Sequence, residues 1–194
     1  MSAVRVALVV LIGLLGGCAR QYQSFEPPPL DFSDRPALQL AVERITIDNV
    51  ALAAGAPRAA DGMLPLTPEA ATRALLEHRL RAVGGPDRLQ AVILDASVKE
   101  EALETSSGVR GFLTTEAAAR LDGRIKVRVD QVDPAGTVLG SISTTVERTR
   151  AIPEGVGYAE RQRIAYELVR DLVDDLDVGL TANIRESFPQ LVRS

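Results

Sequence analysis

The chain has 194 residues, a formal net charge of −4, no tryptophan and a single cysteine. This length predicts one folded domain, and a lone cysteine excludes a disulfide bond within the chain. The mild negative charge argues against a nucleic-acid partner, because binding a phosphate backbone requires a strong excess of basic residues.

Residues 1–17 have the layout of a bacterial export signal. Arg5 supplies the positive start, and the apolar stretch from residue 6 to residue 15 is shorter than the roughly 20 residues that a spanning helix needs. The segment Leu15-Gly16-Gly17-Cys18 then resembles the lipobox of lipoprotein precursors. The resemblance implies cleavage before Cys18, a diacylglycerol on its sulfur and an acyl chain on its amine. This covalent lipid is the only cofactor that we expect. The alternative is a general secretory signal with a chance cysteine.

Residues 18–36 are interpreted as the lipidated cysteine and a tether. The residue after the cysteine is Ala19. In the lipoproteins that this segment resembles, Asp at that position implies retention in the inner membrane, so Ala19 implies transfer of the protein to the periplasmic face of the outer membrane. Prolines at 27–29 and at 36 predict an extended segment of about 3.1 Å per residue. The alternative is that Tyr22, Phe25 and Phe32 pack on the domain or contact a partner.

Residues 37–190 are predicted to fold as the periplasmic domain. Alternation over residues 38–47 predicts one strand with a bulge near Glu43 and Arg44. After a loop over 51–66, Thr67-Pro68-Glu69 has the composition of a helix start, and Gly84-Gly85-Pro86 that of a stop. A second strand covers residues 89–98, with the side chains of Val92, Leu94, Ala96 and Val98 on one face.

The next elements are a hairpin and a long helix. After a polar connection over 104–116, strands at 121–129 and 137–148 flank the turn Asp133-Pro134-Ala135-Gly136. We predict a register that places Val127 opposite Ile142 and Arg128 opposite Ser141. A four-residue apolar repeat predicts a helix over 158–187. The order predicts an α+β domain with two layers: a mostly antiparallel sheet of about four strands, and two helices on one face.

The sequence shows no catalytic constellation, so we predict that the protein is not an enzyme and has no metal site. His78 is the only histidine and is interpreted as a partly exposed helix residue. A run of carboxylates on the long helix, at Asp171, Asp174, Asp175 and Asp177, is interpreted as a solvated acidic face. The alternative is a site for a hard cation such as calcium.

Arg124, Lys126 and Arg128 form the row most open to a functional interpretation. They alternate along one strand and lie about 7 Å apart on one face. Such a row can meet the phosphates of a lipid or glycolipid, or an acidic protein surface. The alternative is a sheet face kept polar against aggregation.

The order of elements resembles two groups of envelope lipoproteins: the LPS-assembly lipoprotein that plugs an outer-membrane barrel, and the auxiliary lipoproteins of lipid ABC transporters. The segments Ile152-Pro153-Glu154 and Asn183-Ile184-Arg185, with Arg148, also resemble uncharacterised bacterial lipoproteins. The resemblance implies that the row Arg124, Lys126 and Arg128 contacts lipid A and that loop 104–116 enters a barrel. We therefore predict a membrane-anchored binding or assembly factor that binds an envelope protein or a lipid. The alternatives are a structural adaptor and a cation-binding protein.

Overall fold

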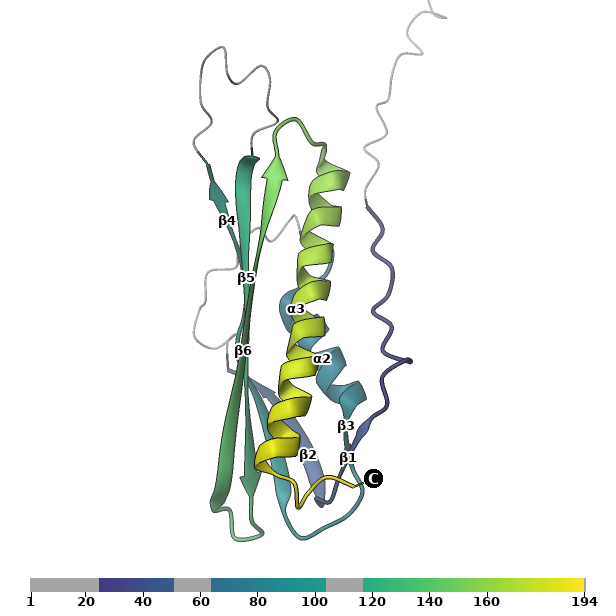
Figure 1. The fold of residues 1–194 in the computed structure, drawn as a ribbon, viewed down its shortest axis with the longest axis vertical. Coiled ribbons are helices and arrows are strands. Elements are labelled where there is room, and N and C mark those ends of the chain that lie inside the picture. The colour runs from purple at the N-terminus through teal and green to yellow at the C-terminus, as the bar shows by residue number, and fades with distance from the viewer. Residues whose placement is uncertain (1–24, 51–63, 104–116, 194) are drawn as a thin grey trace, which may run out of the picture.

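The computed structural model describes residues 25–50, 64–103 and 117–193. Its elements, in chain order, are β1 (Leu38–Leu40), β2 (Arg44–Asn49), α2 (Pro68–Arg79), β3 (Leu80–Ala82), β4 (Arg88–Ala102), β5 (Ala117–Val132), β6 (Val138–Pro153) and α3 (Tyr158–Ser187). They form an elongated body in which long strands and the long helix α3 run along the same axis (Figure 1).

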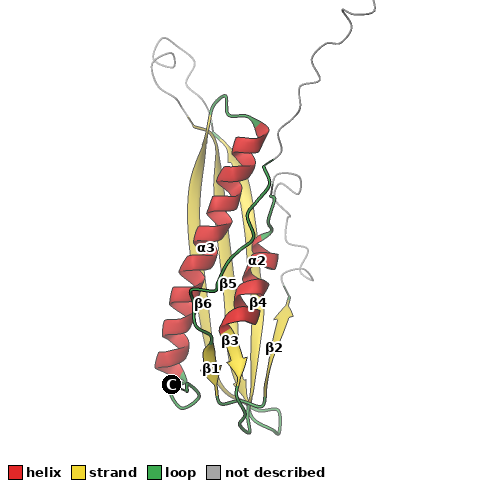
Figure 2. Ribbon diagram, turned by 90° about the vertical axis from the view of Figure 1, so that its right-hand side faces the viewer, coloured by secondary structure: helices red, strands yellow, loops and turns green. Residues whose placement is uncertain are grey.

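The main sheet has four strands in the order β2-β4-β5-β6, and both helices cover one of its faces (Figure 2). β4, β5 and β6 are antiparallel, whereas β2 and β4 are parallel and are connected through α2. A parallel pair requires such a crossover, because a tight turn cannot join strands that run the same way. The predicted α+β fold of two layers is confirmed, with a sheet that is mixed.

The prediction of a single bulged strand at 38–47 is wrong. The chain turns between the two halves, where the amide of Val42 donates to the carbonyl of Leu40 (2.8 Å). β1 pairs with β3 in a separate parallel sheet, and β2 joins the main sheet. β3 itself takes the end of the predicted first helix: Thr67 caps α2 as predicted, but the helix ends at Arg79.

The prediction that Val92, Leu94, Ala96 and Val98 share one face of β4 is also wrong. Leu89, Ala91 and Ile93 are at most 1% exposed and belong to the core. A bulge between Ile93 and Asp95 then shifts the alternation by one residue. Ala96 and Val98 therefore face the core, whereas Val92 lies opposite Arg128 on the other face. A single bulged residue reverses the face of every later side chain in a strand.

The β5–β6 hairpin has the predicted faces but a register displaced by two residues. Val127 lies opposite Thr144 rather than Ile142, and Arg128 lies opposite Ser143. One residue of this displacement is due to a longer turn, in which the amide of Asp133 donates to the carbonyl of Thr137 (2.9 Å). The other is due to a bulge at Leu139, since Gln131 pairs with Gly140 and Val132 pairs with Val138. A shift by an even number leaves each side chain on its own face of the sheet.

α3 has the predicted bounds and buries its apolar face along the sheet. Leu168, Leu172 and Leu176 are fully buried, as are Ile125 and Val127 of β5. Gly123 lets α3 approach β5 closely, because a Cβ atom there would lie 2.5 Å from Cδ1 of Leu172. The core therefore lies between α3, α2 and one face of the sheet.

Candidate functional site

Two sequence predictions concern residues outside the described part of the chain. These are the lipobox, from Leu15 to Cys18, and the polar connection over 104–116. Lipidation of Cys18 and entry of the connection into a barrel therefore stay predictions. The described residues begin at Phe25, inside the predicted tether.

Residues 25–36 lie along α3 and have no helix or strand, with a turn at 33–35 (Figures 1 and 2); we call them the N-terminal strap. The amide of Phe25 donates to Oε1 of Gln162 (3.1 Å), and its ring centroid lies 5.6 Å from that of Tyr166. The hydroxyl of Tyr166 donates to the carbonyl of Pro28 (3.0 Å). Extended backbone was predicted here, but the segment is docked on the helix, as in the alternative that placed its aromatic residues on the domain.

The middle of the strap is buried against α2. Phe32 is only 8% exposed and belongs to the core. Its ring lies 5.8 Å from the ring of His78, whose Nε2 is 3.2 Å from the carbonyl oxygen of Arg35. His78 is thus half-buried and contacts the strap.

The end of the strap is held by charge. Arg35 forms ion pairs with Asp174 (2.8 Å) and Asp177 (3.4 Å) of α3. The hydrogen bond to Asp174 raises the pKa of Arg35, which stays charged. Asp177 also accepts a hydrogen bond from Nε of Arg79 on α2 (2.6 Å), and both of these side chains are about nine-tenths buried. One carboxylate thereby joins α2, α3 and the strap.

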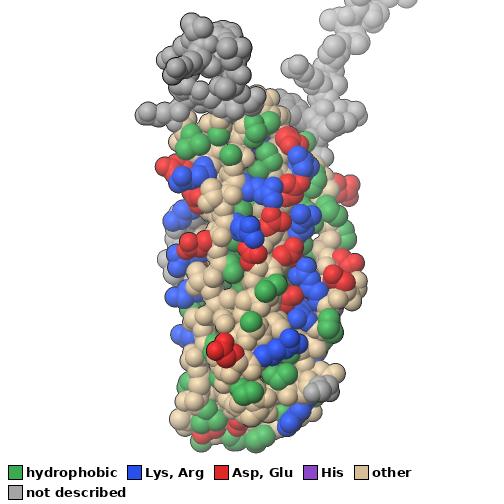
Figure 3. Space-filling view, viewed as in Figure 1, with side chains coloured by type: hydrophobic (Ala, Val, Ile, Leu, Met, Phe, Trp, Pro, Cys, Tyr) green, Lys and Arg blue, Asp and Glu red, His purple; other side chains and the backbone are tan. Residues whose placement is uncertain are grey.

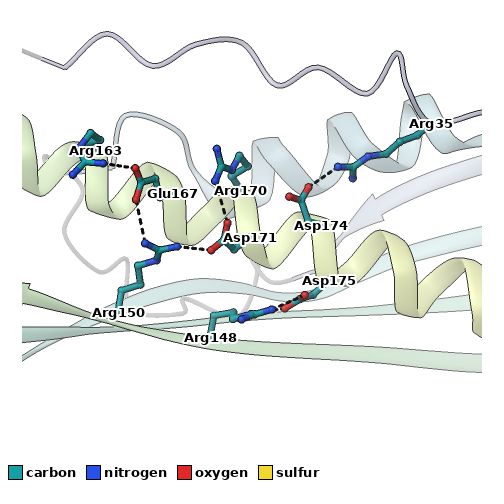
Figure 4. A network of polar contacts seen from close by, with 9 residues as sticks. All are labelled: Arg35, Arg148, Arg150, Arg163, Glu167, Arg170, Asp171, Asp174 and Asp175. Atoms are coloured by element: carbon teal, nitrogen blue, oxygen red, sulfur yellow. Dashed lines mark hydrogen bonds and ion pairs between the residues drawn. The ribbon is translucent and has the colours of Figure 1, made fainter.

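The other carboxylates of the run face β6, where arginines meet them (Figure 4). Arg148 makes two hydrogen bonds to Asp175, one of them 2.8 Å long, and lowers the pKa of that carboxyl. Arg150 bonds Asp171 and Glu167. The sequence predicted a solvated acidic face. Each member of the run is instead paired with an arginine from another element, because residues on several sides of α3 face different neighbours.

The described residues also bear on metal binding and on membrane crossing. Among the described residues there is no group of three or more His, Cys, Asp and Glu side chains that could hold a metal ion. Within the same part of the chain, no helix is long and apolar enough to cross a membrane.

The basic row lies on the sheet face opposite the helices, since Ile125 and Val127 between its members point into the core. Arg124 pairs with Glu147 of β6 (2.9 Å), and Arg128 pairs with Asp130 (3.0 Å). Lys126 forms no ion pair within the described residues. Local carboxylates therefore offset much of the positive charge that the sequence suggested. The pair with Glu147 could not be read from the sequence, because it depends on strand register, whereas Arg128 and Asp130 are two residues apart on the same strand.

The space-filling view shows mixed basic and acidic side chains over the upper part of one face (Figure 3). The arginine–carboxylate pairs of the domain also include Arg161 with Glu100 and Arg163 with Glu160. Arg163 and Glu160 are three residues apart, a spacing that the sequence shows, whereas Arg161 and Glu100 are 61 residues apart and meet through the fold.

Comparison with known proteins gave no match to a family model and none to a curated protein. The chain is similar to solved bacterial structures. A minor lipoprotein from Acinetobacter baumannii is 17% identical, over 80% of this chain and 98% of that one, with a TM-score of 0.42. A DUF330 protein from Xanthomonas campestris is 13% identical, over 88% and 96%, with a TM-score of 0.38. Rare lipoprotein B from Shewanella oneidensis is 11% identical, over 74% and 97%, with a TM-score of 0.37.

Proposed function

We propose that the protein is a lipid-anchored component of the bacterial envelope that acts by binding a partner and not by catalysis. The observation that carries this proposal is Leu15-Gly16-Gly17-Cys18 at the end of an export signal. Three acyl chains on Cys18 anchor a protein firmly, because each buried methylene contributes about 0.8 kcal/mol. With Ala19 next to the anchor, the outer membrane is the proposed location, with the domain in the periplasm.

Metabolic labelling with palmitate tests the anchor. We expect the full chain to be labelled and Cys18→Ala to be unlabelled and released from membranes. Ser24→Ala is a matched control that leaves the lipobox intact. Labelling of Cys18→Ala would refute the proposal, because the chain has no other cysteine.

The end of the domain that contains turn 133–137 is the proposed contact for a protein partner; we call it the hairpin end. Val138 and Leu139 are adjacent there and are 56% and 55% exposed, and the bulge at Leu139 interrupts the regular pairing. Phe188, at the end of α3, lies beside Gly140 and is buried. Exposed aliphatic side chains next to a buried aromatic can form the apolar centre of a protein interface.

Site-specific cross-linking in intact cells tests this contact. A photoreactive residue at Leu139 should yield one defined protein adduct, and Leu139→Asp should abolish co-purification of that protein from detergent-solubilised membranes. Val178 is the matched control, since it is a single aliphatic residue, 73% exposed, on α3. Equal cross-linking at 139 and 178 would contradict a partner at the hairpin end.

A second candidate function is the binding of anionic lipid or lipopolysaccharide by the row Arg124, Lys126 and Arg128. The specific observation in its favour is that Lys126 has no ion pair within the described residues, so its charge is available between two neutralised arginines. Phosphate groups bind such donors through charge-assisted hydrogen bonds.

The lipid candidate is tested by vesicle flotation with phosphatidylglycerol and by lipopolysaccharide binding, both with Cys18→Ala so that the anchor does not contribute. Lys126→Glu should lower binding several-fold, as should Arg124→Glu combined with Arg128→Glu. Arg185→Glu, an exposed arginine in the last turn of α3 and so on the helix side of the sheet, is the control. Unchanged binding in Lys126→Glu would eliminate this candidate and leave the protein partner.

A further inference from the structure

We propose that the N-terminal strap determines which end of the domain faces the membrane. The end that carries the start of α3 faces the lipid surface, and the hairpin end points away from it. This inference rests on the proposed lipid anchor at Cys18 and adds the orientation of the domain.

The first step is the direction of the strap along α3. Phe25 contacts Gln162 and Tyr166, close to the start of the helix. Arg35 contacts Asp174 and Asp177, about three turns further along. The strap and α3 therefore run the same way, and the described chain begins at Phe25, beside the first turns of α3 (Figures 1 and 2).

The second step is the length of chain between the anchor and the strap. Residues 18–24 separate the lipid from Phe25, and seven residues span at most about 25 Å. From Gln162 to the end of α3 at Ser187 the helix rises about 38 Å. The anchor therefore holds the start of α3 near the bilayer, and the opposite end lies beyond the reach of that short connection.

The third step is what the strap contacts prevent. If the chain were free up to the start of β1, the connection would extend to residue 37 and could span about 65 Å. That exceeds the length of α3, about 45 Å for 30 residues, so either end could then face the membrane. The orientation therefore depends on the contacts of Phe25, Phe32 and Arg35.

The surface at the membrane-facing end agrees with this orientation. Tyr158, the first residue of α3, is 46% exposed there, next to the turn at 154–157. Tyrosine favours the boundary between water and lipid, because its ring is apolar and its hydroxyl is polar. The occupant that we propose for this end is the bilayer that holds the acyl chains of Cys18.

The experiment measures energy transfer from a fluorophore on the domain to acceptor-labelled headgroups in phosphatidylethanolamine–phosphatidylglycerol vesicles that carry the lipidated protein. Lipidation consumes the only native thiol, so Glu154→Cys and Ala135→Cys each provide one labelling site, at the two ends. We expect transfer to be several-fold larger from position 154 than from position 135. Equal transfer, or larger transfer from position 135, would overturn the proposal.

Two variants test the role of the strap. Arg35→Glu places a negative charge against Asp174 and Asp177 and should reduce the contrast between the two labelled positions. Arg170→Glu, a half-exposed arginine of the same helix, should preserve it. If Arg35→Glu does not fold, inserting 20 Gly and Ser residues before Phe25 gives the same prediction by lengthening the connection. A contrast unchanged by the insertion or by Arg35→Glu would overturn the role of the strap.

The failure of the anchor and the failure of the orientation give different results. A mass spectrum without the lipid, and a protein that does not float with vesicles, would refute the anchor and with it this inference. A lipidated protein with equal transfer at both ends would refute the orientation alone.

Discussion

Replacing Asp177 by asparagine removes the charge that joins α2, α3 and the strap. The side chain of Asp177 is 11% exposed, and that of Arg79 is 10% exposed. Removing one partner of a buried ion pair costs about 3–5 kcal/mol, because the other charge remains in a poorly solvated place. Nη2 of Arg79 donates to Oγ1 of Thr181 (3.1 Å), which is a neutral acceptor and does not offset the charge, and Nη1 of Arg79 has no hydrogen-bond partner within the described residues. The asparagine keeps one oxygen as acceptor, and we therefore expect a loss of about 3 kcal/mol.

Equilibrium unfolding in urea measures this loss in the mature chain. Asp175→Asn is the matched control, since it removes the same charge two residues away, where Arg148 is 50% exposed and solvent screens the pair. We expect that variant to unfold close to the wild type, with any difference removed by high salt. The stability lost in Asp177→Asn should remain lost in high salt, and adding Arg79→Met to that variant should restore part of it. Equal losses in the two asparagine variants would refute the reasoning from burial.

Three further predictions concern pH, packing and the strap. Arg148 lowers the pKa of Asp175 in the folded state below its value of about 3.8 in the unfolded state, so the ionised carboxyl stabilises the fold at higher pH. As the pH falls below about 4, the free energy of unfolding should therefore decrease more steeply in the wild type than in Arg148→Gln, which unfolding at several pH values measures. Gly123→Val should lower the free energy of unfolding in urea by about 1–3 kcal/mol, because the new side chain meets Leu172. The double variant Gly123→Val with Leu172→Ala should lose less stability than the sum of the two single variants. Phe32→Ala should lower the free energy of unfolding by about 3 kcal/mol, because its ring is buried in the core. Limited proteolysis of this variant should cut first within the strap, and a first cut elsewhere would contradict the docking of the strap.

Local signals predicted several elements well because each is determined by neighbours in the chain. α3 extends over 158–187 as predicted, since a four-residue apolar repeat and the Phe188-Pro189 pair depend only on local sequence. The alternation of β5 likewise placed Ile125 and Val127 in the core. Thr67 caps α2 because its hydroxyl reaches the amide of Ala70, three residues away.

Other features depend on contacts between segments far apart in the sequence. The register of β5 and β6 is displaced by a longer turn and by the bulge at Leu139, which a periodic pattern does not record. The separation of β1 from β2 follows from the pairing of β1 with β3, about 40 residues away. The carboxylates of α3 are paired with arginines because the fold brings β6, α2 and the strap to that helix.

The sequence alone predicts a lipid attachment site, at Cys18, because the segment before it resembles a lipobox, which is a linear motif. It also determined the composition of the core and the classes of its main elements, because hydrophobic periodicity is a local property. Only the tertiary structure decided that Phe25, Phe32 and Arg35 dock on the domain, since their partners on α2 and α3 are between about 45 and 140 residues away. That docking leaves a short connection in place of the predicted longer extended tether, and the proposed orientation of the domain relative to the anchor follows from it.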